Sequence, residues 1–215
     1  MNPRNTINRR IFNFLYQSDY VLLDYQLNFT DQPSEFVLAK NGLDALIKEL
    51  KSYPELAHIR MSSNANFSKI ILEIKEESPL ELVIYHRLVH KSLSYLTAEM
   101  LLFKRRTVAK LQLPALEHLL EFVTLKQFMQ DKGMEERYFR YFDEFHILVQ
   151  EGLLDYFNNK YGTHFSTLFE LTNFSEMEKL TMLKNLKALP GNRFPQNINI
   201  RWSNFVGSLR QARVV

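Results

Sequence analysis

The chain of 215 residues contains no cysteine and only six glycines, none of which is adjacent to another. The absence of cysteine excludes disulfides, thiol catalysis and cysteine-ligated zinc, and it is compatible with a reducing compartment. The isolated glycines exclude the phosphate-binding loops G-x-G-x-x-G and G-x-x-x-x-G-K-[ST], because both need glycines at fixed spacing. No uninterrupted apolar run approaches the roughly 20 residues of a membrane helix, so we expect no membrane partner.

Charge is modest in amount and uneven in distribution. The formal net charge is +3, yet no acid follows Glu178, whereas basic residues continue to Arg213. A second acid-free basic cluster comprises Lys104, Arg105, Arg106 and Lys110. Such stretches either contact phosphates or form solvated faces that complement helix dipoles. A net charge of +3 is low for a nucleic-acid-binding protein, so a nucleic-acid partner is not expected. The N-terminus has no apolar export segment, and we expect a cytoplasmic protein.

Alternating and β-branched residues dominate one part of the first half. They predict strands at 57–62, 67–75 and 80–90, and the polar segment 76–79 predicts an antiparallel hairpin between the last two. Shorter extended segments are expected at 20–28 and 35–39. Helical spacing of apolar residues predicts one helix over 7–15 and another that begins behind Asn41 as its cap. Thr97 is expected to cap a further short helix.

From Pro114 onward the apolar period is helical. We expect Pro114 in the first turn of a helix that ends near Gly133. One long helix is expected to present a single apolar face, made of Tyr138, Tyr141, Phe142, Phe145, Leu148, Val149, Leu153 and Tyr156. A capping box over 175–178 opens a third helix, and an amphipathic stretch surrounds Trp202. The sequence thus predicts an α+β protein: a small mixed or antiparallel sheet with flanking helices (1–110), followed by a C-terminal helical bundle (111–215).

Histidine spacing invites a test for metal binding. His86 and His90 are the only histidine pair within one predicted element. Arg87 and Lys91 beside them repel a cation, and no carboxylate stands at the H-E-x-x-H position, so we expect no metal site. The four residues instead form a polar rim at a strand end that is able to contact a nucleotide or another anionic ligand.

Two carboxylates flank the predicted hairpin turn. Glu73 and Glu81 either face each other across the hairpin, as two-metal chemistry requires, or are solvated beside Lys69 and Lys75. No D-x-D sequence occurs in the chain, which favours the solvated arrangement.

Two segments carry a family resemblance. They are Ser34–Leu46, with the sequence S-E-F-V-L-A-K-N-G-L-D-A-L, and Leu80–Leu96, which contains Y-H-R-L-V-H-K-S-L-S-Y-L. In both, over roughly residues 30–105, the chain resembles the nucleotidyltransferase-like family, and in particular bacterial members that pair a minimal nucleotidyltransferase fold with a helical C-terminal domain. The first segment resembles the family's acidic strand and following helix, and the second resembles the strand with its third acid.

The resemblance also implies what has been lost. Active members of the family carry a Gly-Ser turn, two Asp at D-x-D spacing and a third Asp on the neighbouring strand, which together hold Mg²⁺ against nucleotide phosphates. Here the first strand has Glu35 as its only acid, and Val83 occupies the third position. The resemblance therefore implies a non-catalytic binding or interaction protein that needs no cofactor.

Two other hypotheses stay open. The chain is alternatively a working nucleotidyl- or phosphotransferase that uses Mg²⁺ and whose acids are arranged differently among Glu35, Glu73 and Glu81. A further alternative is a helical nucleic-acid-binding module that uses the basic C-terminal segment.

The polar rim generates a testable prediction. If the rim binds anions, Arg87→Ala should weaken the binding of nucleotides and polyanions, because one cation is removed. The loss should shrink as salt screens the charge, which titration at low and high ionic strength would measure. Unchanged binding by both Arg87→Ala and Lys91→Ala would contradict a role for the rim.

Overall fold

The computed structural model of the chain describes residues 3–23, 34–64, 66–90, 93–108, 110–128 and 133–188. These residues form two compact units. The first unit contains the described residues up to Arg87 together with Thr97–Pro114, and the second contains Leu88–Leu96 and the described residues from Ala115 onward. The domain boundary at residue 110 stays a prediction.

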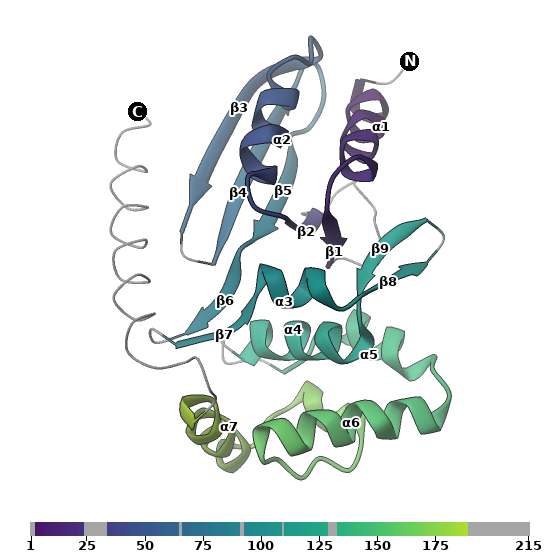
Figure 1. The fold of residues 1–215 in the computed structure, drawn as a ribbon, viewed down its shortest axis with the longest axis vertical. Coiled ribbons are helices and arrows are strands. Elements are labelled where there is room, and N and C mark those ends of the chain that lie inside the picture. The colour runs from purple at the N-terminus through teal and green to yellow at the C-terminus, as the bar shows by residue number, and fades with distance from the viewer. Residues whose placement is uncertain are drawn as a thin grey trace. The chain divides into compact units, whose positions relative to one another are not determined.

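A five-stranded sheet forms the centre of the first unit (Figure 1). Its strands, in spatial order, are β1 (Tyr20–Leu22), β2 (Ser34–Leu38), β5 (Leu80–Tyr85), β4 (Phe67–Ile74) and β3 (Leu56–Ser63). Strand β2 runs parallel to β5, and the other neighbours are antiparallel. The mixed sheet and the later helices confirm the predicted α+β class, and the pairing of β4 with β5 confirms the predicted hairpin.

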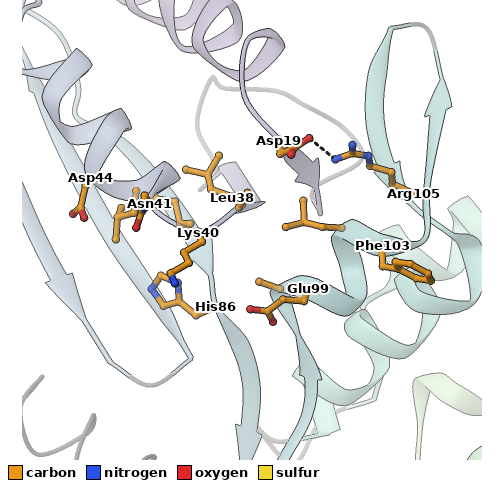
Figure 2. Close-up of a pocket in the computed structure, with 14 residues that line it drawn as sticks. Asp19, Leu38, Lys40, Asn41, Asp44, His86, Glu99, Phe103 and Arg105 are labelled. Carbon is orange, nitrogen blue, oxygen red and sulfur yellow. Dashed lines mark ion pairs between the residues drawn. The ribbon is translucent and has the colours of Figure 1, made fainter.

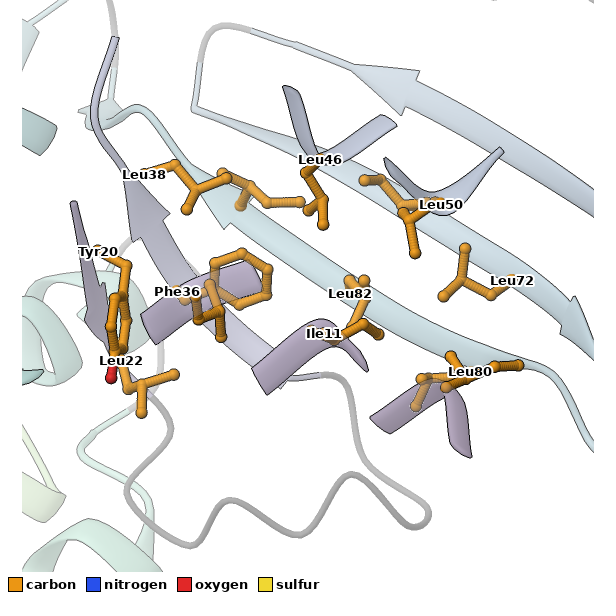
Figure 3. Close-up of a cluster of buried hydrophobic side chains, with 14 of the residues drawn as sticks. Ile11, Tyr20, Leu22, Phe36, Leu38, Leu46, Leu50, Leu72, Leu80 and Leu82 are labelled. Atoms are coloured by element: carbon orange, nitrogen blue, oxygen red, sulfur yellow. The ribbon is translucent and has the colours of Figure 1, made fainter. Parts of the chain in front are cut away.

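One face of this sheet is covered by two helices, α1 (Pro3–Tyr16) and α2 (Gly42–Leu50) (Figure 1). Alternate residues of β4 point toward the helices, because successive side chains of a strand lie on opposite faces. The buried cluster therefore joins helix residues to strand residues, among them Ile11, Leu46, Phe36, Leu72 and Leu82 (Figure 3). Burial of this apolar layer holds the sheet and both helices together.

The strand expected over 80–90 is interrupted at His86, which corrects the sequence prediction. The backbone N–H groups of His86 and Arg87 both donate to the carbonyl of Asn66, at 2.8 and 3.2 Å. Two donors on one acceptor end the regular ladder with β4. The chain continues as β6 (Arg87–His90), which pairs with β7 (Leu93–Thr97) in a separate two-stranded sheet.

Residues 97–114 form a helix and a hairpin. Helix α3 (Ala98–Phe103) is capped by Thr97, whose Oγ1 accepts from the N–H of Met100 at 3.3 Å, as the sequence predicts. Strands β8 (Arg105–Val108) and β9 (Leu111–Pro114) then pair antiparallel. The sequence analysis missed this hairpin because the segment is short and basic. Pro114 ends β9 instead of opening a helix, which is a further correction.

The second unit is mainly helical. It contains α4 (Leu116–Phe128), α5 (Glu136–Asp143), α6 (Ile147–Tyr161), the 3₁₀ helix η1 (Leu168–Thr172) and α7 (Glu176–Ala188). The capping box is confirmed: the N–H of Ser175 donates to Glu178 Oε2 at 2.7 Å, and the N–H of Glu178 donates to Ser175 Oγ at 3.3 Å. No helix among the described ranges is long and apolar enough to cross a membrane.

The single long helix expected over 138–156 is wrong. The chain leaves the helix after Asp143 and begins α6 at Ile147, where His146 Nδ1 accepts from the N–H of Leu148 at 3.3 Å. This break changes the helical phase, so Tyr138 is buried while Leu148 is exposed. The extended segment expected at 20–28 is observed only over 20–22. The rest of it from residue 24, and the stretch around Trp202, lie outside the described residues.

The apolar layer generates a stability prediction. Leu46→Ala should lower the free energy of unfolding by about 3 kcal/mol, because it removes a fully buried side chain between α2 and the sheet and leaves a cavity. Denaturant titration followed by circular dichroism would measure the loss. Lys48→Ala, on the exposed side of the same helix, is the matched control and should change the stability little. Equal effects of the two substitutions would contradict the assigned core.

Candidate functional site

A pocket of about 670 Å³ lies in the first unit, at the ends of β2 and β5 (Figure 2). Because these two strands are parallel, their carboxyl ends lie at the same edge of the sheet. Helix α2 begins directly after β2 at this edge, and α3 supplies a further part of the wall. Ligands of open sheets with parallel strands bind outside the carboxyl ends of those strands. The volume falls in the range of small-molecule sites, about 300–1,000 Å³.

The turn between β2 and α2 has a demanding backbone. Asn41 adopts a left-handed conformation with φ of 68° and makes no side-chain cap hydrogen bond, which corrects the expected capping role. A Cβ at Gly42 would lie 2.8 Å from the Cβ of Leu38, so glycine allows the close approach of helix to strand. Leu43 and Asp44 in the first turn of α2 line the pocket, so the partial positive charge of the helix N-terminus lies beside it.

The pocket wall carries charges of both signs. Lys40 in the β2–α2 turn and Arg105 at the start of β8 are the cations, and His86 is the imidazole. The carboxylates are Asp19, Asp44 and Glu99. The Arg105 Nη1 lies 3.0 Å from Asp19 Oδ1, so these two charges balance each other (Figure 2).

Lys40, unlike Arg105, is not ion-paired within the described residues. Its side chain is exposed and extends toward His86 (Figure 2). It is therefore a cation of the wall that is available to a ligand.

His86 is held firmly at the end of β5. The ring Nε2 of His86 lies 2.8 Å from the hydroxyl of Ser68. The backbone N–H of His86 donates to the carbonyl of Asn66 at 2.8 Å, and its backbone carbonyl accepts from the N–H of Ala98 at 2.8 Å. Burial lowers the pKa of His86 below its ordinary value of 6.5, and the nearby Arg87 guanidinium lowers it further. The imidazole is therefore neutral at neutral pH and carries one proton on its two nitrogens.

An exposed aromatic residue lies on the opposite side of the pocket. Phe103, the last residue of α3, is 87% exposed, although phenylalanine is normally buried. Leu102 and Leu43 add apolar surface to the wall. The pocket wall thus combines polar groups and apolar side chains from both α2 and α3.

The three carboxylates that sequence analysis selected lie elsewhere. Glu35 is in register with Val83, which places its side chain on the sheet face opposite Phe36 and outside the pocket lining. Glu73 and Glu81 do not face each other. Glu73 Oε1 lies 2.6 Å from an Arg60 Nη2, and Glu81 Oε2 lies 2.5 Å from the ammonium of Lys69.

The predicted polar rim is described only in part. His86 lines the pocket, whereas Arg87 is half-buried and does not line it. The side chain of His90 and the whole of Lys91 lie outside the described part of the structure. The ligand-binding role of the four residues stays a prediction.

Sequence analysis missed several residues of the wall, among them Lys40, Asp44, Glu99 and Phe103. Each is a single polar or aromatic residue, and these residues come together only through the pairing of β2 with β5 and the contact of Ala98 with His86. The one available signal was the K-N-G turn before an amphipathic helix.

A second polar cluster lies in the second unit. Glu121 of α4 is fully buried and accepts hydrogen bonds from the hydroxyls of Tyr156 and Tyr161 of α6. The ammonium of Lys160 lies 2.5 Å from its Oε1. Burial opposes the charge of Lys160, but attraction to Glu121 outweighs burial and raises the pKa of the ammonium. Four satisfied polar groups thus fix α4 against α6.

Within the described ranges, no three His, Asp or Glu side chains form a group that could hold a metal ion. The expectation of no metal site and no cofactor stays a prediction.

Comparison with known proteins yields two similar solved structures. JHP933 from Helicobacter pylori matches over 96% of this chain and 96% of its own, with 13% identity and a TM-score of 0.39. A "putative nucleotidyltransferase" from H. pylori matches over 93% and 95%, with 12% identity and a TM-score of 0.38. No protein-family model and no curated protein matches the chain.

The environment of His86 generates a prediction for its titration. In an NMR titration, the ring protons of His86 should titrate below pH 6.5, because burial and Arg87 both disfavour the charged form. Above pH 6.5 this group costs no stability. As the pH falls toward its lowered pKa, the unfolded state binds the proton more readily, so the free energy of unfolding decreases.

Arg87→Ala is the informative variant for this measurement. This substitution should raise the pKa of His86 but leave it below 6.5, because burial, the larger cause of the lowering, persists. A pKa at or above 6.5 in the unmodified protein would contradict the assigned environment.

Proposed function

We propose that the chain is a nucleotidyltransferase-like protein that binds a nucleotide in the pocket at the ends of β2 and β5 without catalysing its transfer. The observation that carries this proposal is the position of the pocket, at the carboxyl ends of two parallel strands where a helix begins. The resemblance of residues 30–105 to the nucleotidyltransferase-like family points to the same ligand class.

The phosphate end of the nucleotide belongs beside α2. The available cation of Lys40, the imidazole of His86 and the N–H groups at the start of α2 lie on that side of the pocket. N–H groups at a helix N-terminus and an ammonium both favour phosphate oxygens.

The mixed charge of the wall favours a nucleotide over a simple anion. The carboxylate of Glu99 on α3 disfavours a simple anion, but it can accept hydrogen bonds from sugar hydroxyls. The exposed ring of Phe103 offers a face on which a planar base can stack. Phosphate, hydroxyl and ring contacts are thus all available to one ligand.

The positions of the three carboxylates that the sequence analysis selected support binding without transfer. Glu35 lies on the sheet face opposite Phe36, while Glu73 and Glu81 are engaged by Arg60 and Lys69. The pocket carboxylates Asp19, Asp44 and Glu99 do not form a metal-binding group within the described ranges. Transfer of a nucleotidyl group by two metal ions requires carboxylates clustered beside the phosphates. The alternative, a working transferase that uses Mg²⁺, is an outcome of the experiment below.

Calorimetric titration tests the proposal. ADP should bind more tightly than pyrophosphate or adenosine, because it alone makes all three kinds of contact. Lys40→Ala should weaken ADP binding about fivefold to tenfold, since it removes one charge-assisted hydrogen bond. Lys48→Ala, on α2 but outside the pocket lining, is the matched control and should leave the affinity unchanged.

Two results would decide against the proposal. Absence of ADP and ATP binding, with and without Mg²⁺, would overturn the nucleotide-binding role. Binding that requires Mg²⁺, together with release of pyrophosphate from ATP in the presence of an acceptor, would favour the transferase.

A further inference from the structure

Two serine hydroxyls and His86 form a continuous hydrogen-bonded chain. Ser63 Oγ lies 2.7 Å from Ser68 Oγ, and Ser68 Oγ lies 2.8 Å from His86 Nε2. Ser63 and Ser68 are directly opposed on β3 and β4, and Ser68 is opposed to Ile84 on β5. This hydrogen-bonded chain therefore runs from β3 across β4 to His86, which directly follows β5 and lines the pocket.

The position of the imidazole is fixed by backbone contacts as well. Both N–H groups at the bend, those of His86 and Arg87, donate to Asn66. Asn66 itself belongs to a turn in which Asn64 Oδ1 accepts from the N–H groups of Asn66 and Phe67, at 2.7 and 3.0 Å. The ring is held from its backbone and from one nitrogen, so its orientation toward the pocket is fixed before any ligand binds.

This arrangement leaves one ring atom for a ligand. Ser68 occupies Nε2, and no hydrogen bond in the described part of the chain engages Nδ1. A neutral imidazole carries one N–H and one lone pair. When Ser63 donates to Ser68 and Ser68 donates to Nε2, the ring proton resides on Nδ1. The opposite direction of this hydrogen-bonded chain requires the ring proton to move to Nε2, in addition to the rotation of both hydroxyl hydrogens.

We propose that His86 binds a phosphate oxygen of the pocket ligand through Nδ1–H, in the tautomer that the Ser63–Ser68 hydroxyl chain stabilises. This inference rests on the proposed function, and it specifies the ring atom and the tautomer of His86 that bind the phosphate. His86 is then a specificity-determining residue, and Ser68 is a positioning residue that acts through it.

The charged groups around His86 give the contact a pH dependence. The ionisable residues that share the pocket lining with it are Lys40 from the β2–α2 turn, Asp44 from α2 and Glu99 from α3. Burial and the neighbouring Arg87 disfavour a charged imidazole. When acid nevertheless protonates the ring, Nδ1–H persists and gains charge, so the contact to the phosphate strengthens.

Two isosteric substitutions separate the ring nitrogens. The amide nitrogen of asparagine takes roughly the place of Nδ1, and that of glutamine takes roughly the place of Nε2. His86→Gln keeps the contact to Ser68 and loses the ligand contact, so ADP binding should weaken about fivefold to tenfold. His86→Asn keeps a donor toward the ligand and should weaken binding by about twofold or less.

The pH profile distinguishes this role from a structural one. The ratio of the ADP dissociation constant of each variant to that of the unmodified protein is compared near neutral pH and at about pH 5. Titration of ADP itself cancels in this ratio. Both ratios should rise in acid, because only the unmodified protein gains the imidazolium charge. Ser68→Ala should weaken binding near neutral pH by about threefold and lose that defect in acid, where no tautomer has to be selected.

The outcomes separate the inference from the function beneath it. No ADP binding by the unmodified protein overturns both. In a second outcome, Lys40→Ala weakens ADP binding, but His86→Gln and His86→Asn change it equally or not at all near neutral pH. This outcome overturns the inference and leaves the proposed function intact. Thermal melting of each variant identifies misfolding. Should His86→Gln fail to fold, the Ser68→Ala profile decides, and a defect that is the same at both pH values overturns the inference.

Discussion

Strand β5 lies between β2, to which it is parallel, and β4, to which it is antiparallel. Parallel pairing cannot be made by a tight turn, so the chain between β2 and β5 must cross the sheet, and α2 with the β3–β4 hairpin makes that crossing. The crossing brings the carboxyl ends of β2 and β5 to one edge. It also places the start of α2 at this edge, which is where the pocket forms.

The apolar layer makes this arrangement stable. Leu46 and Leu50 of α2 pack against the strand residues that also contact Ile7, Ile11 and Leu15 of α1. Since these side chains fill one face of the sheet, the charged residues of the same strands lie on the other face. There Lys69 and Arg60 neutralise Glu81 and Glu73. Ion pairs of partly exposed groups contribute little stability, yet they occupy carboxylates that catalysis would need.

The two units differ in whether their polar side chains are fully hydrogen-bonded within the protein. In the second unit, Glu121 is fully buried and is satisfied by Lys160 and two tyrosine hydroxyls, so it has no capacity left for a ligand. In the first unit, Lys40 and His86 line a pocket, and neither the Lys40 ammonium nor the His86 Nδ1 makes a hydrogen bond within the described residues. The first unit therefore offers more exposed hydrogen-bonding groups to the proposed ligand than the Glu121 cluster does.

The sequence by itself determined the α+β class, the antiparallel hairpin of β4 and β5, the Thr97 cap and the capping box at Ser175, because each depends on residues near one another in the chain. It singled out His86 through a local pattern as well. Only the tertiary structure decided the parallel pairing of β2 with β5 and the break at His86. It also decided that Lys40, Glu99 and Phe103 line the same pocket. Those features depend on contacts between distant segments, and the periodicity of a strand does not specify which strand it pairs with.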